Sequence, residues 1–149
     1  MTLRDELVAT ELTSFSIVVE RSQLQFFAAA IGEQRGAYVD VASARALNYP
    51  DLLVPPTFFF SLELKRPDPY AALRAAGAQL SQILHAEQSF TYHQLAFAGD
   101  ELHLAPRITD YYEKKGGALS FLTRTTTVSR NGELVAELVN LAAIRRTVK

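Results

Sequence analysis

Residues 55–64 read PPTFFFSLEL, and this stretch decides how the rest of the chain can fold. Its apolar residues would surround most of the circumference of a helix, which is typical of a buried helix rather than a surface helix. Pro56 suits the first turn of such a helix, because proline lacks an N–H that would need a partner there. The stretch therefore predicts a central helix that a sheet must cover.

Four strand-like runs follow this stretch, and three of them are rich in β-branched or aromatic residues. They are QILHAEQSFTYHQ (82–94), DELHLAPRITDYYEK (100–114), ALSFLTRTTTVSR (118–130) and ELVAELVNLAAIRR (133–146). The segments AGD, KGG and NG separate them, and Asn131-Gly132 favours a type I′ hairpin. We predict an antiparallel meander of four strands wrapped around the central helix, which is an α+β arrangement.

The residues before the central stretch predict one strand and two helices. The run TSFSIVVE (13–20) is strand-like, and residues 20–31 place Leu24 and Ala28 on one helical face with Phe27 and Ile31. Ser22 is a candidate N-cap for this helix, and Gly32 should end it. A second short helix is expected within residues 40–49.

Composition limits the classes of function. The chain has 149 residues, so we expect one domain over residues 1–149. Its 15 basic and 16 acidic residues give a net charge of −1 and no basic cluster, so neither nucleic acid nor a membrane is expected as a partner. The absence of cysteine excludes disulfides, thiolate zinc sites and a cysteine nucleophile. No signal peptide or membrane span is visible, and we expect a cytoplasmic protein.

Few motifs for catalysis are present. Phosphate-binding loops, metal-ligand spacings and nucleophile elbows are missing, so we expect no metal and no cofactor. The three histidines, His85, His93 and His103, all fall on predicted strands. Strict alternation would place His85 and Glu87 on one face of a strand, with Phe90 on the other face. That face either meets solvent or a partner subunit, or provides His85 as a catalytic group.

Several strings taken together resemble the MaoC-like hot-dog hydratases and dehydratases. They are FFAAAIGE, ARALNYPDLLVPPTFF, LHAEQSFTYHQLAFAGDEL and the hairpin around RNGELVAE, and their order and spacing match over about residues 15–146. The chain resembles most the N-terminal MaoC-like, or FAS1-like, dehydratase domains and the substrate-binding subunits of (3R)-hydroxyacyl-carrier-protein dehydratases. The resemblance implies a single hot-dog domain in which the sheet wraps around the central helix.

The resemblance also implies the reaction, which is reversible addition of water to a trans-2-enoyl thioester. An Asp and a His on the loop after the first helix act as acid and base in that family, and a backbone N–H at the start of the central helix binds the developing oxyanion. In this chain the loop reads AIGEQRGAYVD (30–40), with Glu33 at the Asp position and Tyr38 at the His position. Tyrosine has a pKa of about 10 and is a poor base at neutral pH.

The oxyanion position of the family falls on Pro55-Pro56, and proline has no N–H to donate. A shift of the alignment by one residue would give this role to the N–H of Thr57. Phe58, Phe59 and Phe60, together with Pro56 and Thr57, are candidate substrate-binding residues that either wall an acyl tunnel or only fill the core.

The predicted function is therefore the substrate-binding half of a dehydratase or hydratase, acting on an acyl or enoyl thioester of CoA or acyl carrier protein. It would form a homodimer, or a heterodimer with a MaoC-like subunit that carries the Asp/His pair. Two alternatives stay open. One is a self-sufficient hydratase that pairs Glu33 with His85, and the other is a hot-dog thioesterase in which a carboxylate such as Glu33 activates water.

Overall fold

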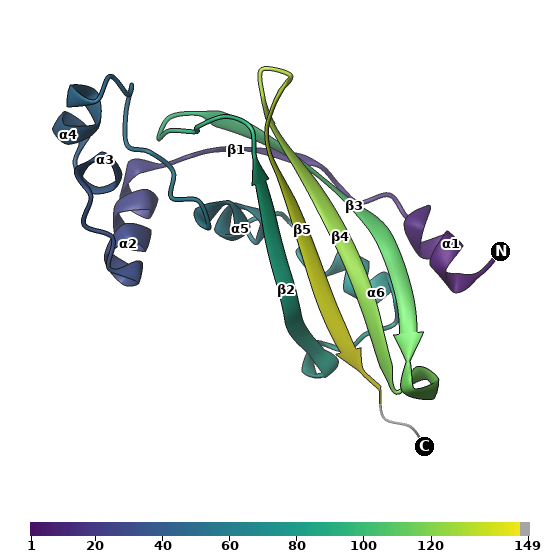
Figure 1. Cartoon of the computed structure of the whole chain (residues 1–149). Helices are drawn as coiled ribbons and strands as arrows, with labels where there is room; N and C mark the ends of the chain where they lie inside the picture. The colour runs from purple at the N-terminus through teal and green to yellow at the C-terminus, as the bar shows by residue number, and fades with distance from the viewer. Residues whose placement is uncertain (147–149) are drawn as a thin grey trace.

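The structure, a computed structural model, describes residues 1–146. A five-stranded antiparallel sheet forms one layer, in the order β1-β3-β4-β5-β2 (Figure 1). The strands are β1 (Phe15–Val18), β2 (Ile83–Tyr92), β3 (Glu101–Lys114), β4 (Leu119–Arg130) and β5 (Glu133–Arg145). The four runs predicted from residues 82–146 are all strands, so this part of the prediction is confirmed.

The helices lie mainly on one face of the sheet. They are α2 (Arg21–Ile31), α3 (Gly36–Val39), α4 (Val41–Ala46), α5 (Phe58–Glu63) and α6 (Ala71–Ala75), and two 3₁₀ turns cover Leu80–Gln82 and Lys115–Gly117. The predicted central helix is α5, where Phe58, Phe59 and Leu62 pack into the main core with residues of β3, β4 and β5. The α+β arrangement of a sheet around a buried helix is confirmed.

The predicted four-strand meander is wrong in one connection. β3, β4 and β5 follow one another in the sheet, but β2 pairs with β5 and not with β3. The chain leaves β2 by residues 93–100, which is too long for a tight hairpin, and Phe97 makes an isolated bridge to Leu53. The connection therefore carries the chain across the end of the sheet, and β2 becomes an edge strand.

Turn residues at two places adopt the conformations that the sequence predicts. Asn131 has φ 51° and Gly132 has φ 78°, as the type I′ hairpin between β4 and β5 requires. Gly32 ends α2 with φ 72°. The expected Ser22 cap is wrong, because the N-cap of α2 is Glu20 and it makes no side-chain capping bond.

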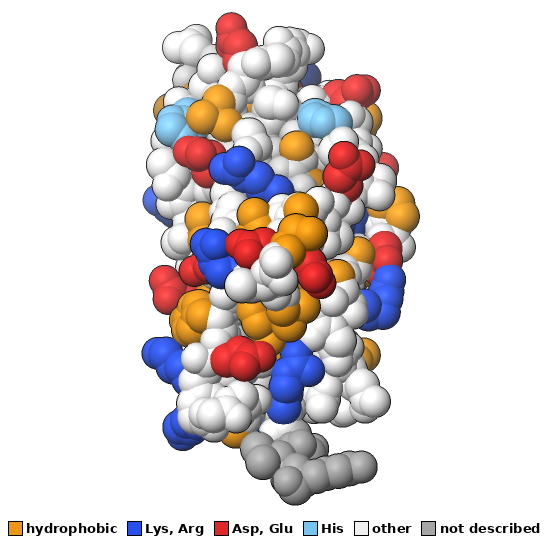
Figure 2. Space-filling model, turned by 90° about the vertical axis from the view of Figure 1, so that its right-hand side faces the viewer, with side chains coloured by type: hydrophobic (Ala, Val, Ile, Leu, Met, Phe, Trp, Pro, Cys, Tyr) orange, Lys and Arg blue, Asp and Glu red, His pale blue; other side chains and the backbone are white. Residues whose placement is uncertain are grey.

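A short helix at the N-terminus, α1 (Leu3–Val8), lies beside β3 and was not expected from the sequence. Thr2 and Asp5 form a capping box at its start, and Arg4 Nε donates to Asp110 Oδ1 on β3 at 2.7 Å. On the face seen in Figure 2, acidic, basic and hydrophobic side chains are interspersed. Within residues 1–146, no helix has both the length and the apolar character that crossing a membrane requires.

Candidate active site

The loop after α2 takes its shape from Gly32. The Gly32 amide donates to the carbonyl of Ala29 at 3.2 Å, and the Glu33 amide donates back to the carbonyl of Ala28 at 2.8 Å. Glycine adopts the left-handed conformation needed here without the steric cost of a Cβ. This turn fixes the point at which the Glu33 side chain leaves the end of the helix.

The Glu33 carboxylate is held by Arg35 in a bidentate ion pair. Arg35 Nε donates to Glu33 Oε1 at 3.0 Å, Nη2 donates to Oε2 at 2.6 Å, and the Arg35 backbone amide donates to Oε1 at 2.8 Å. Hydrogen bonds from the Arg35 side chain, and then from its amide, lower the pKa of Glu33 to about 2. A carboxylate with so low a pKa is a poor general base at neutral pH.

Tyr38 lies in α3 and is half-buried. The guanidinium carbon of Arg35 lies 5.2 Å from the centroid of the Tyr38 ring, within the range of a cation–π contact. A single arginine therefore joins the two loop residues that the sequence singled out. The loop from Gly32 to Asp40 contains no histidine, so no imidazole accompanies the carboxylate here.

Each of the three histidines is engaged away from this loop. His85 Nδ1 lies 3.2 Å from Asn140 Nδ2 on β5, and its ring meets the ring of Phe60 edge-on at 5.6 Å. The other two form hydrogen-bonded pairs, His93 with Glu137 at 3.0 Å and His103 with Ser16 at 3.1 Å. Among the described residues, no group of three His, Cys, Asp or Glu side chains could hold a metal ion.

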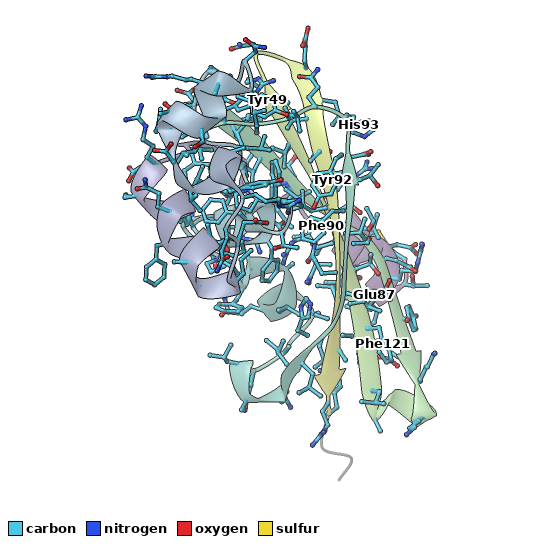
Figure 3. The ribbon with its side chains drawn as sticks, turned by 60° about the vertical axis from the view of Figure 1, so that its left-hand side comes forward. Tyr49, Glu87, Phe90, Tyr92, His93 and Phe121 are labelled. Carbon is cyan, nitrogen blue, oxygen red and sulfur yellow. The ribbon has the colours of Figure 1, made fainter. Side chains whose placement is uncertain are left out.

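The prediction that His85 and Glu87 share a face of β2 is wrong. The pairing of β2 with β5 shifts register between these two residues, so His85 is opposite Ala142 and Glu87 is opposite Leu141. An extra residue in one strand reverses the alternation beyond it. His85 is opposite the buried Ala142 and contacts Phe60, so it faces the core side. Phe90 also lies on this side, whereas Glu87 lies on the outer side of the sheet (Figure 3).

The start of α5 leaves the backbone amide of Thr57 free within the described part of the chain. Pro55 accepts from the amide of Phe58 at 3.0 Å, which closes the first turn, and Pro56 is exposed with no N–H to donate. Thr57, at the N-cap, has an amide that makes no hydrogen bond with any described residue. The Thr57 amide is therefore a backbone donor that this helix end can offer to an oxyanion.

An open hollow of about 290 Å³ adjoins this helix start. It lies between α2, α5 and β2, and it is lined by Phe27, Thr57, Phe60, Ser61, His85, Gln88 and Phe90. Two predicted substrate-binding residues, Thr57 and Phe60, therefore line a hollow. Phe58 and Phe59 are core residues, with 4% and 3% of their surface exposed, and Phe58 packs against Phe27 with ring centroids 5.2 Å apart.

Comparison with known proteins assigns the chain to a family. Residues 6–138 match the family described as FAS1-like, dehydratase domain region. The chain belongs to this family. It is a MaoC-like hot-dog dehydratase domain, as its sheet order, its central helix and its structural neighbours agree.

Relatives of this FAS1-like dehydratase domain include a UPF0336 protein of Parafrankia sp., which is 33% identical over 143 residues covering 92% of this chain and 91% of the relative. A UPF0336 protein of Streptomyces coelicolor is 36% identical over 90 residues. That match covers 60% of each chain, so it spans less than two thirds of the relative's length.

Solved structures of similar fold include two complexes from Mycobacterium tuberculosis. C-terminally truncated HadBC, described as a (3R)-hydroxyacyl-ACP dehydratase complex, has a TM-score of 0.71 and 25% identity, covering 87% of this chain and 90% of that chain. The ChsH1–ChsH2 complex has a TM-score of 0.76 and 21% identity, covering 97% of this chain and 90% of that chain. A MaoC-like dehydratase has a TM-score of 0.78 and 23% identity, covering 95% of this chain and 44% of that chain.

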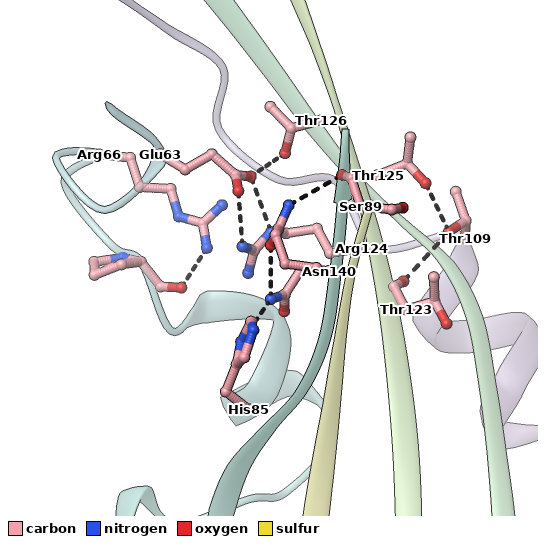
Figure 4. A network of polar contacts seen from close by, with 12 residues as sticks. Glu63, Arg66, His85, Ser89, Thr109, Thr123, Arg124, Thr125, Thr126 and Asn140 are labelled. Atoms are coloured by element: carbon pink, nitrogen blue, oxygen red, sulfur yellow. Dashed lines mark hydrogen bonds and ion pairs between the residues drawn. The ribbon is translucent and has the colours of Figure 1, made fainter. Parts of the chain in front are cut away.

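The FAS1-like dehydratase domain also contains a polar belt, which we define as Glu63, Arg124, Thr126, Asn140, Gln88 and His85. Its first four members are buried, Gln88 is half-buried and His85 is exposed. Arg124 Nε and Nη2 donate to Oε1 and Oε2 of Glu63, each at 3.2 Å, and the Thr126 hydroxyl donates to Glu63 as well (Figure 4). Asn140 is opposite Arg124 on one side and opposite Gln88 on the other. The belt crosses the sheet between the two apolar clusters of the core.

Sequence reasoning missed this belt, although a signal for it exists. Arg124 and Thr126 alternate with half-buried threonines between Leu122 and Val128, so they share the inward face of β4. Glu63 follows the apolar run of the central helix by one turn and is 1% exposed. A charged residue on a face that must be buried indicates a partner of opposite charge on the facing strand.

Proposed function

We propose that this chain is the substrate-holding half of a (3R)-hydroxyacyl-thioester dehydratase, or of the trans-2-enoyl-thioester hydratase that runs the same reaction in reverse. The observation that carries the proposal is the state of the loop after α2. Its carboxylate, Glu33, is bound on both oxygens by Arg35, and no imidazole lies on the loop. The acid–base pair would come from a MaoC-like partner subunit.

The geometry gives this half a consistent role. Dehydration removes a proton from C2 of the hydroxyacyl thioester and transfers one to the departing hydroxyl, so it needs a proton acceptor and a donor close together. Glu33 and Tyr38 do not form such a pair. The hollow beside α5 has the aromatic walls that an acyl chain requires, formed by Phe27, Phe60 and Phe90.

Similar proteins support a partner subunit. HadBC is described as a complex that dehydrates (3R)-hydroxyacyl-ACP, and ChsH1–ChsH2 is likewise a complex of two chains. By analogy, we propose that this chain pairs with a dyad-bearing homologue and that its ligand is an acyl thioester of CoA or acyl carrier protein. Pairing with a second copy of itself is the other form of the proposal. The cytoplasmic location and the single domain over residues 1–149 remain predictions.

Neither alternative gains support from an observation on the structure. A self-sufficient hydratase needs Glu33 and His85 together, but Glu33 binds Arg35 whereas His85 contacts Asn140 and Phe60. A thioesterase needs a carboxylate that activates water, and the low pKa of Glu33 makes it a weak base for that step.

Reconstitution tests the proposal. The chain is produced alone and together with a dyad-bearing MaoC-like subunit from the same genome, and both crotonyl-CoA hydration and CoA release are followed. We expect hydration only from the pair, and we expect Phe60→Ala in this chain to raise KM while the partner's acid–base pair is intact. Rapid CoA release by the chain alone would favour the thioesterase and contradict the proposal.

A further inference from the structure

The hollow beside α5 combines aromatic walls with polar side chains. Phe27, Phe60 and Phe90 form apolar walls, and His85 and Gln88 of β2 stand where the polar belt reaches the surface. His85 is exposed and Gln88 is half-buried, so water reaches both when no ligand is bound. A purely alkyl ligand that covered them would replace this water with hydrocarbon, which costs free energy. A ligand that covers His85 and Gln88 must therefore satisfy their polar groups.

Asn140 determines which polar groups of His85 and Gln88 are already engaged and which have no partner within the described residues. Its Nδ2 can only donate, and it lies 3.2 Å from His85 Nδ1 and 3.1 Å from Gln88 Oε1. His85 Nδ1 must then accept, which puts the proton of the neutral ring on Nε2. Gln88 Nε2 donates one hydrogen to the carbonyl of Ser89 at 3.3 Å and keeps a second. Asn140 is 7% exposed, so this arrangement is anchored from inside the core.

These two residues present donors with no partner among the described residues, namely the Nε2–H of His85 and the second Nε2 hydrogen of Gln88. No acidic side chain lines the hollow to accept from them, and no Lys or Arg lines it to attract a carboxylate. The complementary group is an uncharged oxygen that accepts hydrogen bonds, as in a ketone or a hydroxyl group.

We propose that this hollow selects acyl thioesters whose chain carries a further oxygen, as a keto or hydroxyl group, beyond the carbon that bears the reacting hydroxyl. His85 and Gln88 are the specificity-determining residues, and they bind that oxygen while the aromatic walls hold the carbon chain. This inference rests on the proposed function, because it assumes that the hollow holds the acyl group of a thioester.

Matched probes test the inference. S-hexanoylpantetheine is compared with its 4-oxo, 5-oxo and 6-hydroxy analogues by calorimetry on the full chain as it purifies. Pantetheine is the part that CoA and acyl carrier protein share, so the choice of carrier does not affect the comparison. We expect at least one oxygenated probe to bind about five- to tenfold more tightly than hexanoyl, the ratio that one net hydrogen bond gives.

Three variants locate the effect. His85→Phe keeps an aromatic ring against Phe60 and removes the donor, and Gln88→Leu removes the second donor. Each should reduce the ratio of the affinity for the preferred oxygenated probe to that for hexanoylpantetheine to about twofold or less. His103→Phe, on β3, should leave this ratio unchanged. As a readout that needs no stable variant, the ring signals of His85 in NMR spectra of the wild type should shift more with the preferred probe than with hexanoyl.

The outcomes distinguish failure of this inference from failure of the proposed function. If hexanoyl binds as tightly as every oxygenated probe, the inference is wrong and the proposed function survives. If the His85 ring responds equally to all probes, the inference also fails. If no six-carbon probe binds at all, the proposed function fails and takes this inference with it.

Discussion

At the scale of single residues, the ion pair between Glu33 and Arg35 makes a prediction about pH. The folded chain lowers the pKa of Glu33 to about 2 from its usual value of 4.5, so the ionised form is the stabilising one. Its contribution is complete above about pH 5 and is lost as the pH falls through the folded value. The difference in Tm between wild type and Glu33→Gln should therefore be largest at pH 6–7 and should shrink towards pH 2. A difference that is independent of pH would contradict this assignment.

The buried pair of Glu63 and Arg124 makes a second prediction. Both side chains are almost fully buried, so removing one charge leaves the other without a partner in the core. We expect Arg124→Met alone to cost about 3–5 kcal/mol in urea unfolding, and the double variant Glu63→Leu/Arg124→Met to recover much of that loss. Additive losses in this double-mutant cycle would show that the two side chains do not depend on each other.

At the scale of elements, the close contact between α3 and α4 makes the third prediction. A Cβ on Gly36 would lie 2.7 Å from Cβ of Ser43, which is nearer than such atoms approach. Asp40 caps α4 by accepting from the Ser43 amide at 2.8 Å, so Ser43 cannot easily give way. Gly36→Ala should lower stability by about 1–3 kcal/mol, as overpacking typically does. Ala42→Gly, at an exposed position of α4, is the control and should cost about 1 kcal/mol or less.

Most elements of the fold follow from local patterns, whereas their connections do not. The apolar run at residues 55–64 and the Asn131-Gly132 turn predicted α5 and the last hairpin, because both signals reside in neighbouring residues. The place of β2 beside β5 depends on contacts distant in sequence, and no local pattern encodes it. The bulge in β2 likewise has no local signal in the sequence. One unpaired residue breaks the alternation of the strand and places His85 and Glu87 on opposite faces.

The candidate site was predictable in part. The loop at residues 30–40 and the helix start at Pro55-Pro56 could be located from the sequence and from family resemblance. The bidentate hold of Arg35 on Glu33 could not, because side chains two residues apart meet in this way only in the particular backbone conformation that the loop adopts. Placing Glu33 and Tyr38 in a functional site remains a prediction.

At the scale of the whole molecule, the open edge of the sheet predicts association. β2 spans ten residues and pairs only with β5, and its other side has no strand within the described residues. Long uncovered edges are seldom left free in natural proteins. We expect the purified chain to sediment as a dimer at micromolar concentration, or to join a dyad-bearing homologue when the two are produced together. A chain that stays monomeric in both preparations would contradict this prediction.

The central claim is that this chain holds substrate and does not catalyse the reaction by itself. A positioned general base contributes roughly 10²–10⁴-fold to a rate, and one oxyanion donor contributes roughly 10²–10³-fold. With Glu33 bound by Arg35 and no imidazole on the loop, the general base is missing even though the Thr57 amide is free within residues 1–146, so hydration by the lone chain should be close to the uncatalysed rate.

The most direct test is the hydration of crotonyl-CoA by the lone wild-type chain, measured beside Glu33→Gln. The account predicts that both proteins give the rate of buffer alone. Hydration by the wild type at tens of turnovers per second, abolished in Glu33→Gln, would contradict it.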